Sequence, residues 1–325
     1  MRILIVFAVC AALVAQTPQK PPQKPTDEGL PSITVDVNVV SVLTSVRDKK
    51  GTLIPSLIKD DFTITEDGKP QTIKYFTRET DLPLTIGLLV DVSGSQRNLI
   101  NIEQAAAGQF FAQVLRKKDL AFLLMFGEEA ELLQDYTGSP RLLNEGLRQL
   151  RVSSGVQGIH PGPVPTISQP RGTVLYDAIY LAANEKLKGE VGRKVICVIT
   201  DGVDQGSRMT LNQAVEAAQK ADAVIYSIDY SDPSAYGGAF GFGGGGGEGP
   251  LRKMSDETGG HMYKVDRKHS LDQVFQELQD EMRSQYMIGY TPVNETKDGS
   301  YRKIDIKLSN KDLKAQARKG YYATK

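Results

Sequence analysis

The feature that most constrains this chain is an apolar run that ends in a cluster of polar side chains. Residues 84 to 90 are almost entirely apolar, and Asp91, Ser93 and Ser95 follow at alternate positions. A continuous apolar run of this length predicts a strand buried on both faces, as in a parallel sheet covered by helices. Ligands bind at the carboxyl ends of such strands in open α/β sheets. One carboxylate and two hydroxyls at this edge suit a hard divalent cation.

Length and composition narrow the class of protein. The chain has 325 residues, which is enough for about two domains, and 40% of them are hydrophobic. Its formal net charge is zero, so no overall basic field would draw it to nucleic acid or anionic lipid, and we expect no nucleic-acid partner. Cys197 lies in a predicted buried strand and is interpreted as a small core residue and not as a nucleophile.

The N-terminus has the pattern of a targeting segment. Arg2 precedes an apolar stretch that is too short to span a bilayer comfortably, so residues 1 to 15 are interpreted as a signal peptide. Residues 16 to 31 are rich in Gln, Pro and Lys and predict a flexible linker. We therefore expect an exported protein, periplasmic or secreted, with no transmembrane segment in its mature form. An alternative interpretation makes Cys10 a lipidated cysteine.

Two segments at opposite ends of the mature chain have β character. Residues 32 to 82 begin with apolar and polar side chains in alternation, and Asp67 and Gly68 separate two further strand candidates as a hairpin signal. Residues 286 to 325 alternate in the same way, most clearly around Ile304. A segment this short makes a poor independent domain. We therefore expect the two segments to form one split β-sandwich.

Residues 83 to 285 alternate predicted strands with predicted helices. After the first strand we expect, in order, a helix over 97–116, strands over 120–126 and 131–136, a helix starting at Pro140, a helix over 175–187, a strand over 195–200, a helix over 211–221, a strand over 224–228 and a final amphipathic helix over 269–285. This order predicts an α/β domain with a doubly wound, Rossmann-like, mostly parallel sheet. Its two ends would lie close together, which permits insertion into the split sandwich.

Two further segments bring oxygen donors to the same sheet edge. Thr173 comes just before a predicted helix, and Asp201 just after a predicted buried strand. The strands that end at Asp91 and Asp201 should be neighbours where the strand order reverses, and their carboxyl ends should share one crevice with the Thr173 loop. The candidate metal ligands are therefore Asp91, Ser93, Ser95, Thr173 and Asp201.

This combination resembles the von Willebrand factor A (VWFA) domain and its metal-ion-dependent adhesion site (MIDAS), whose pattern is Asp-x-Ser-x-Ser, a distant Thr and a later Asp. The flanking segments, over residues 46–70 and 286–322, resemble those of secreted bacterial VWFA-related proteins. The resemblance implies a VWFA domain over residues 83–285. It also implies that Ser93 and Ser95 coordinate the metal directly, while the threonine and the aspartates act directly or through water.

The chemistry of the five candidate side chains predicts which metal they bind and what the bound metal does. Hydroxyls are neutral, so only Asp91 and Asp201 contribute negative charge, and the cation stays electrophilic and keeps waters. Mg²⁺ prefers such a site, Mn²⁺ is the expected substitute, and Ca²⁺ fits less well. An open coordination position would accept an Asp or Glu side chain of a partner protein. We therefore expect a metal-dependent protein-binding module that is not an enzyme.

Two other functions stay open at this point. A serine hydrolase would use Ser93 or Ser95 as nucleophile, but it needs a positioned base, and none of the three histidines stands in a helpful motif. A structural envelope protein would use the metal only to stabilise its fold. Loops over residues 152–171 and 236–249 are expected to shape selectivity. A second group of polar residues is expected either to shape the ligand rim or to cap loops and face solvent: Gln96, Asn98, Asp204 and Ser207. Asp177 is expected either to form hydrogen bonds around the Thr173 loop or to serve as such a cap.

Overall fold

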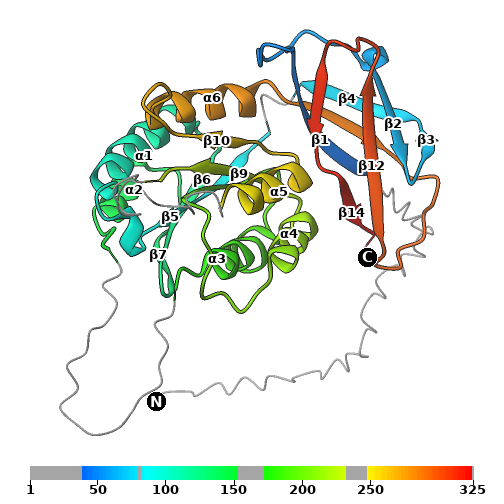
Figure 1. Ribbon diagram of the computed structural model, residues 1–325. Helices are drawn as coiled ribbons and strands as arrows, with labels where there is room; N and C mark the ends of the chain where they lie inside the picture. The colour runs from blue at the N-terminus through cyan, green and yellow to red at the C-terminus, as the bar shows by residue number, and fades with distance from the viewer. Residues whose placement is uncertain (1–38, 79–81, 153–171, 232–246, 324–325) are drawn as a thin grey trace, which may run out of the picture. The chain divides into compact units, whose positions relative to one another are not determined.

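A computed structural model describes residues 39–78, 82–152, 172–231 and 247–323 (Figure 1). All of these residues belong to one compact part of the chain, Asn38–Lys325. The predicted signal peptide, the predicted linker and the strand expected to begin at residue 32 lie outside the described residues. The same holds for most of the two loops that were expected to shape selectivity.

The α/β domain is built on a six-stranded sheet in the order β10-β9-β8-β5-β6-β7. All neighbouring pairs are parallel except β6 with β7, which is antiparallel. Every residue of β5 and β8 is buried, as expected for strands covered on both faces. The strands are β5 (Leu84–Asp91), β6 (Leu120–Phe126), β7 (Ala130–Thr137), β8 (Arg193–Thr200), β9 (Ala223–Asp229) and β10 (Met262–Lys264). The predicted doubly wound α/β fold is confirmed.

Helices cover both faces of this sheet (Figure 1). One face packs against α1 (Ile100–Val114), α2 (Pro140–Leu147) and α6 (Leu271–Arg283), where the rings of Phe110 and Phe275 stack with centroids 4.5 Å apart. The other face packs against α3 (Leu175–Leu181), a π-helical turn (Ala182–Leu187), α4 (Leu211–Lys220) and α5 (Glu248–Thr258). Within the described residues, no helix combines the length and the apolar character needed to cross a bilayer.

Several predicted elements differ in detail from those observed. The helix expected over residues 97–116 is a 3₁₀ turn (Gly94–Gln96) followed by α1. The helix expected over residues 175–187 is α3 continued by the π-helical turn. Helix α5 and strand β10 were not expected, because α5 offers few apolar residues at helical spacing and β10 has only three residues.

The remaining strands form two antiparallel four-stranded sheets, in the orders β13-β1-β11-β4 and β14-β12-β2-β3. Each sheet combines strands that precede the α/β domain with strands that follow it, so the α/β domain is inserted between the two halves of a sandwich. The exact boundaries of these segments stay predictions. The strands are β1 (Val40–Arg47), β2 (Phe62–Glu66), β3 (Lys69–Gln71), β4 (Ile73–Arg78), β11 (Tyr286–Tyr290), β12 (Tyr301–Leu308), β13 (Lys314–Ala317) and β14 (Gly320–Tyr322).

The predicted Asp-Gly hairpin is present, with a different second strand. Asp67 and Gly68 both have positive φ, at 47° and 77°, as a two-residue turn of type I′ requires. The turn joins β2 to the short β3. The next strand, β4, pairs with β11 in the other sheet, and not with β2 as we expected. The chain therefore crosses from one sheet of the sandwich to the other directly after the hairpin.

One glycine of the central sheet makes room for a ring on the next strand. Gly87 lies opposite Phe122, and a Cβ at position 87 would lie 2.3 Å from Phe122 Cζ. The Gly87→Ala variant should lose about 2 kcal/mol of unfolding free energy, because the buried ring has nowhere to move. Denaturant unfolding measures this, with Gly189→Ala as the control because nothing lies within 4 Å of its added Cβ. Equal stability of the two variants would contradict the prediction.

Candidate metal centre

The predicted ligands come from three loops at the carboxyl ends of the parallel strands. Strands β5 and β8 are parallel neighbours, so Asp91 at the end of β5 and Asp201 just past β8 lie at the same edge. The structure brings Ser93, Ser95, Thr173 and Asp201 together around one cavity of about 280 Å³. The convergence expected from the sequence is therefore found for four of the residues, whereas Asp91 does not line the cavity.

A chain of oxygen atoms runs along one side of this cavity. Ser93 Oγ and Ser95 Oγ are 3.0 Å apart, and Ser95 Oγ donates to Asp201 Oδ2 at 2.7 Å. Adjacent ligands of an octahedral Mg²⁺ with bonds of about 2.1 Å lie roughly 3.0 Å apart. The observed spacing therefore fits neighbouring positions around such an ion. Asp201 Oδ1 accepts from the backbone N–H of Val203, which holds this carboxylate in place.

Asp91 lies beneath the cavity and orients it. Its side chain is completely buried, Oδ1 accepts from Ser93 N at 2.9 Å, and Oδ2 accepts from Thr200 Oγ1 at 2.6 Å. Burial raises the pKa of Asp91 to about 6, and the hydrogen bonds from Thr200 and Ser93 oppose this shift. Sequence reasoning missed Thr200, although its place as the last residue of β8, next to Asp201, could have indicated it.

Backbone hydrogen bonds tie the Thr173 loop to its neighbours. Val174 N donates to Gly127 O at 2.8 Å, and Gln205 N donates to Thr173 O at 3.0 Å. A Cβ at Gly172 would lie 2.3 Å from Gln205 Cβ, so this close approach of the two loops requires glycine. The hydroxyl-bearing loop is thus positioned by main-chain contacts on both sides.

The other polar residues singled out in the sequence are mostly caps. Ser207 Oγ accepts from the N–H groups of Tyr176 and Asp177 at the start of α3, and donates to Asp204. The Asp177 carboxylate accepts from the backbone N–H groups at positions 208 and 209. Gln96 is fully buried and donates to Tyr230 O. The contacts of Asp177, Asp204 and Ser207 therefore support loop capping, whereas Gln96 has neither expected role and is part of the core.

The cavity is acidic. Asp201 and Glu128 are the carboxylates that line it, and no Lys, Arg or His is found among its described lining residues. Glu128 was not identified from the sequence, because nothing in the turn after β6 distinguishes it from a solvated glutamate. In the described part of the chain, no group of three or more His, Cys, Asp or Glu side chains is placed to hold a metal ion. A cation here therefore depends on the serine and threonine hydroxyls as donors.

Comparisons with known proteins find similar chains only among solved structures. No protein-family model matches the chain, and no curated protein shows significant similarity to it. An aerotolerance-related membrane protein from Bacteroides fragilis is 17% identical, with 61% of this chain and 98% of that chain covered and a TM-score of 0.46.

Two further solved structures are similar to this chain at lower identity. The VWA domain of SpRpn10 is 13% identical, with 61% of this chain and 95% of that chain covered and a TM-score of 0.40. Proximal thread matrix protein 1 from the mussel byssus, solved with a zinc-occupied MIDAS motif, is 12% identical. The match covers 67% of this chain and 49% of that chain, with a TM-score of 0.46.

Proposed function

We propose that this protein is an exported, metal-dependent protein-binding module of the VWFA type. Ser93, Ser95 and Asp201 would hold a Mg²⁺ ion in a cavity that Thr173 also lines. The ion binds an Asp or Glu side chain of a partner protein. The observation that carries the proposal is the continuous chain of hard oxygen donors, at 3.0 and 2.7 Å, along an acidic cavity at the carboxyl ends of β5 and β8.

Some residues of this site bind the metal, and others orient the loop that carries the metal-binding residues. The serine hydroxyls and the Asp201 carboxylate face the cavity and are the direct donors. Asp91 and Thr200 lie below and fix the Ser93 loop through two hydrogen bonds. A bound Mg²⁺ supplies an electrophilic centre with open positions, because most of its protein donors are neutral.

Non-enzymatic function is part of the proposal, and the contacts of the two serines favour it. A nucleophilic serine usually has a histidine base within hydrogen-bond reach, and no histidine is among the described residues that line this cavity. Among the described residues, the side-chain partners recorded for Ser93 and Ser95 are each other and Asp201. Both serine hydroxyls therefore belong to the donor chain. Labelling of either serine by a fluorophosphonate would contradict this part of the proposal.

Calorimetric titration of the mature protein with MgCl₂ tests the metal site. We expect one bound Mg²⁺ per chain, and an affinity lower by at least about tenfold in Ser95→Ala, because one donor is lost and Asp201 loses its hydroxyl partner. Ser300→Ala, an exposed serine on the β-sandwich, is the control and should bind as the wild type does. Absence of Mg²⁺ and Mn²⁺ binding by the folded wild type would overturn the proposal.

A second measurement distinguishes a metal that binds a partner protein from a metal that only stabilises the fold. Water-proton relaxation with Mn²⁺ in the site reports how many exchangeable waters the ion keeps. N-acetyl-aspartate amide, a mimic of an acidic side chain, should lower the relaxation enhancement as it displaces a metal-bound water. An enhancement that does not change with this compound would indicate a closed, structural site and would contradict the partner-binding role.

A further inference from the structure

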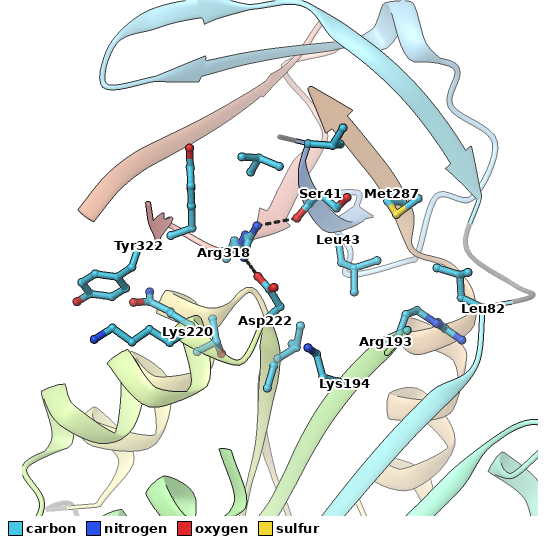
Figure 2. A pocket seen from close by; sticks show the side chains of 18 residues that line it. Ser41, Leu43, Leu82, Arg193, Lys194, Lys220, Asp222, Met287, Arg318 and Tyr322 are labelled. Carbon is cyan, nitrogen blue, oxygen red and sulfur yellow. Dashed lines mark hydrogen bonds and ion pairs between the residues drawn. The ribbon is translucent and has the colours of Figure 1, made fainter. Parts of the chain in front are cut away.

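A second cavity lies between the α/β domain and the β-sandwich (Figure 2). Its volume is about 440 Å³, within the range of small-molecule sites. One wall is formed by the amino ends of β8 and β9, and the other includes Leu43 of β1 and Met287 of β11. Lys194 lies near the start of β8, and Asp201 follows the end of this strand seven residues later. From the rise per residue of a β-strand, the cavity therefore lies about 23 Å from the candidate metal centre. It is therefore a separate site.

Lys194 places an unpartnered ammonium group at this cavity. The residue lines the cavity and is only 8% exposed. Within the described part of the chain, it forms neither a hydrogen bond nor an ion pair, although Asp222 lies nearby (Figure 2). Burial lowers the pKa of Lys194, as expected for an ammonium group removed from water. Buried charges are normally paired, so this group is poised to receive an anion.

The other charged residues of the cavity already have partners. Arg318 donates to the Asp222 carboxylate and to Ser41 O (Figure 2). Lys220 pairs with Glu216 on the surface of α4, and Arg193 donates to Met282 O at 2.5 Å. Among the described lining residues, Asp222 is the only acidic one, and Arg318 occupies it. Among the described lining residues, Lys194 is therefore the cation for which no hydrogen bond or ion pair is found.

The rest of the wall sets the shape of the ligand. Side chains of both domains give it an apolar surface, with Val40, Leu43 and Met287 from the sandwich and Val224 from β9. The two lining arginines, Arg193 and Arg318, already have partners, so Lys194 offers one compact charge and not the paired N–H donors that favour phosphate. The Lys194 ammonium group beside these apolar side chains matches a single carboxylate that carries a hydrophobic body.

We propose that this cavity binds a small monocarboxylate with an aliphatic or aromatic body, with its carboxylate on Lys194 and its body against the neighbouring side chains of Leu43 and Met287. The ligand contacts both domains at once and therefore stabilises their contact. This site is independent of the proposed metal centre, and neither requires the other to be occupied.

Titration of the full mature chain with sodium hexanoate, followed by ligand-observed NMR and calorimetry, tests the proposal. We expect saturable binding, at least about tenfold weaker in Lys194→Met, with partial recovery in Lys194→Arg. Hexanamide, which has the same body without the charge, should bind weakly. Met287→Trp keeps Lys194 but fills the cavity, and should also abolish binding. Lys194→Met removes a buried unpaired charge, so we expect it to fold.

Other results would overturn the proposal. These are no saturable binding of hexanoate, equal affinity in Lys194→Met, or hexanoate binding that survives in Met287→Trp. Binding of inorganic phosphate in preference to hexanoate would replace the carboxylate with a different anion. Magnesium titration of Lys194→Met should match the wild type, so failure of the carboxylate site and failure of the metal centre are distinguishable.

Discussion

The Glu281→Ala variant should lose about 3–5 kcal/mol of unfolding free energy, a large effect for a single substitution. Glu281 lies on α6 and is completely buried. Its Oε2 accepts from Arg47 at 2.6 Å and from the Tyr263 hydroxyl at 2.7 Å, and its Oε1 accepts from the Ser45 hydroxyl at 2.9 Å. Removing this carboxylate leaves the three donors without their acceptor.

The effect is large because the contacts join two domains. Ser45 and Arg47 belong to β1 of the sandwich, whereas Glu281 and Tyr263 belong to the α/β domain. The pairing is screened from solvent, since the Arg47 side chain is 21% exposed and that of Glu281 is not exposed at all. We therefore expect Glu281→Ala also to loosen the contact between the domains, so that a single calorimetric transition broadens or splits in two.

A surface glutamate on the same helix provides the control. Glu277 pairs with His269 at 2.9 Å, and its side chain is 48% exposed. Glu277→Ala should cost less than about 1 kcal/mol, as solvent-exposed pairs usually do. A double-mutant cycle of Arg47→Ala with Glu281→Ala would isolate the pair itself. A loss in Glu281→Ala no greater than that in Glu277→Ala would contradict the prediction.

The Glu103→Met variant should gain about 2 kcal/mol of unfolding free energy at pH 8, measured with EDTA present to keep metal out. Glu103 is fully buried in the first turn of α1, and among the described residues neither carboxyl oxygen has a hydrogen-bond partner. Methionine has a similar volume and needs no such partner. The position near the helix N-terminus only partly offsets the cost of burying this carboxyl.

The stability gained in Glu103→Met should increase with pH. Burial, and to a lesser extent the charge of Asp91, raises the pKa of Glu103 well above its ordinary value of 4.5. The unfolded chain loses this proton near pH 4.5, while the folded chain retains it to higher pH. Wild-type stability therefore falls as the pH rises above 4.5, and this contribution is absent in Glu103→Met. The advantage of the variant should be small at pH 4 and grow towards pH 8.

Denaturant unfolding at several pH values measures this difference. Gln113→Met introduces the same side chain at an exposed position of α1 and should show no pH-dependent gain. A Glu103→Met variant that is less stable than the wild type at pH 8 would mean that Glu103 has an essential partner. A gain that is equal at pH 4 and pH 8 would contradict the ionisation argument.

Most of the α/β fold was predictable because its strands and helices follow from local patterns of apolar residues. The continuous apolar run of β5 predicts a strand covered on both faces, and Cys197 in the predicted strand β8 is indeed a free, fully buried core residue. Helical spacing of apolar residues located α6. The polar residues after β5 and β8 had to meet, since the ends of neighbouring parallel strands share an edge.

Contacts between distant segments could not be predicted in the same way. Glu281 and Glu103 have the sequence surroundings of ordinary helix-surface glutamates, yet both are fully buried. Asp91 was expected to act on the metal directly or through water, and only the structure shows that it lies outside the cavity lining, with hydrogen bonds from Ser93 and Thr200. The crossing of β4 to the opposite sheet depends on pairing with β11, which lies more than two hundred residues away in the chain.

The sequence by itself determined most of the strands and helices of the α/β domain, the doubly wound order and the edge where oxygen donors gather, but not α5 or β10. Each of these follows from hydrophobic periodicity and chain connectivity, which are local properties. Only the tertiary structure decided which charges are buried, which donors face a cavity and where Lys194 lies, because burial and pairing depend on residues brought together from far apart. Local sequence patterns do not show which distant residues become neighbours. The charges that line both proposed sites can therefore be identified only from the folded structure.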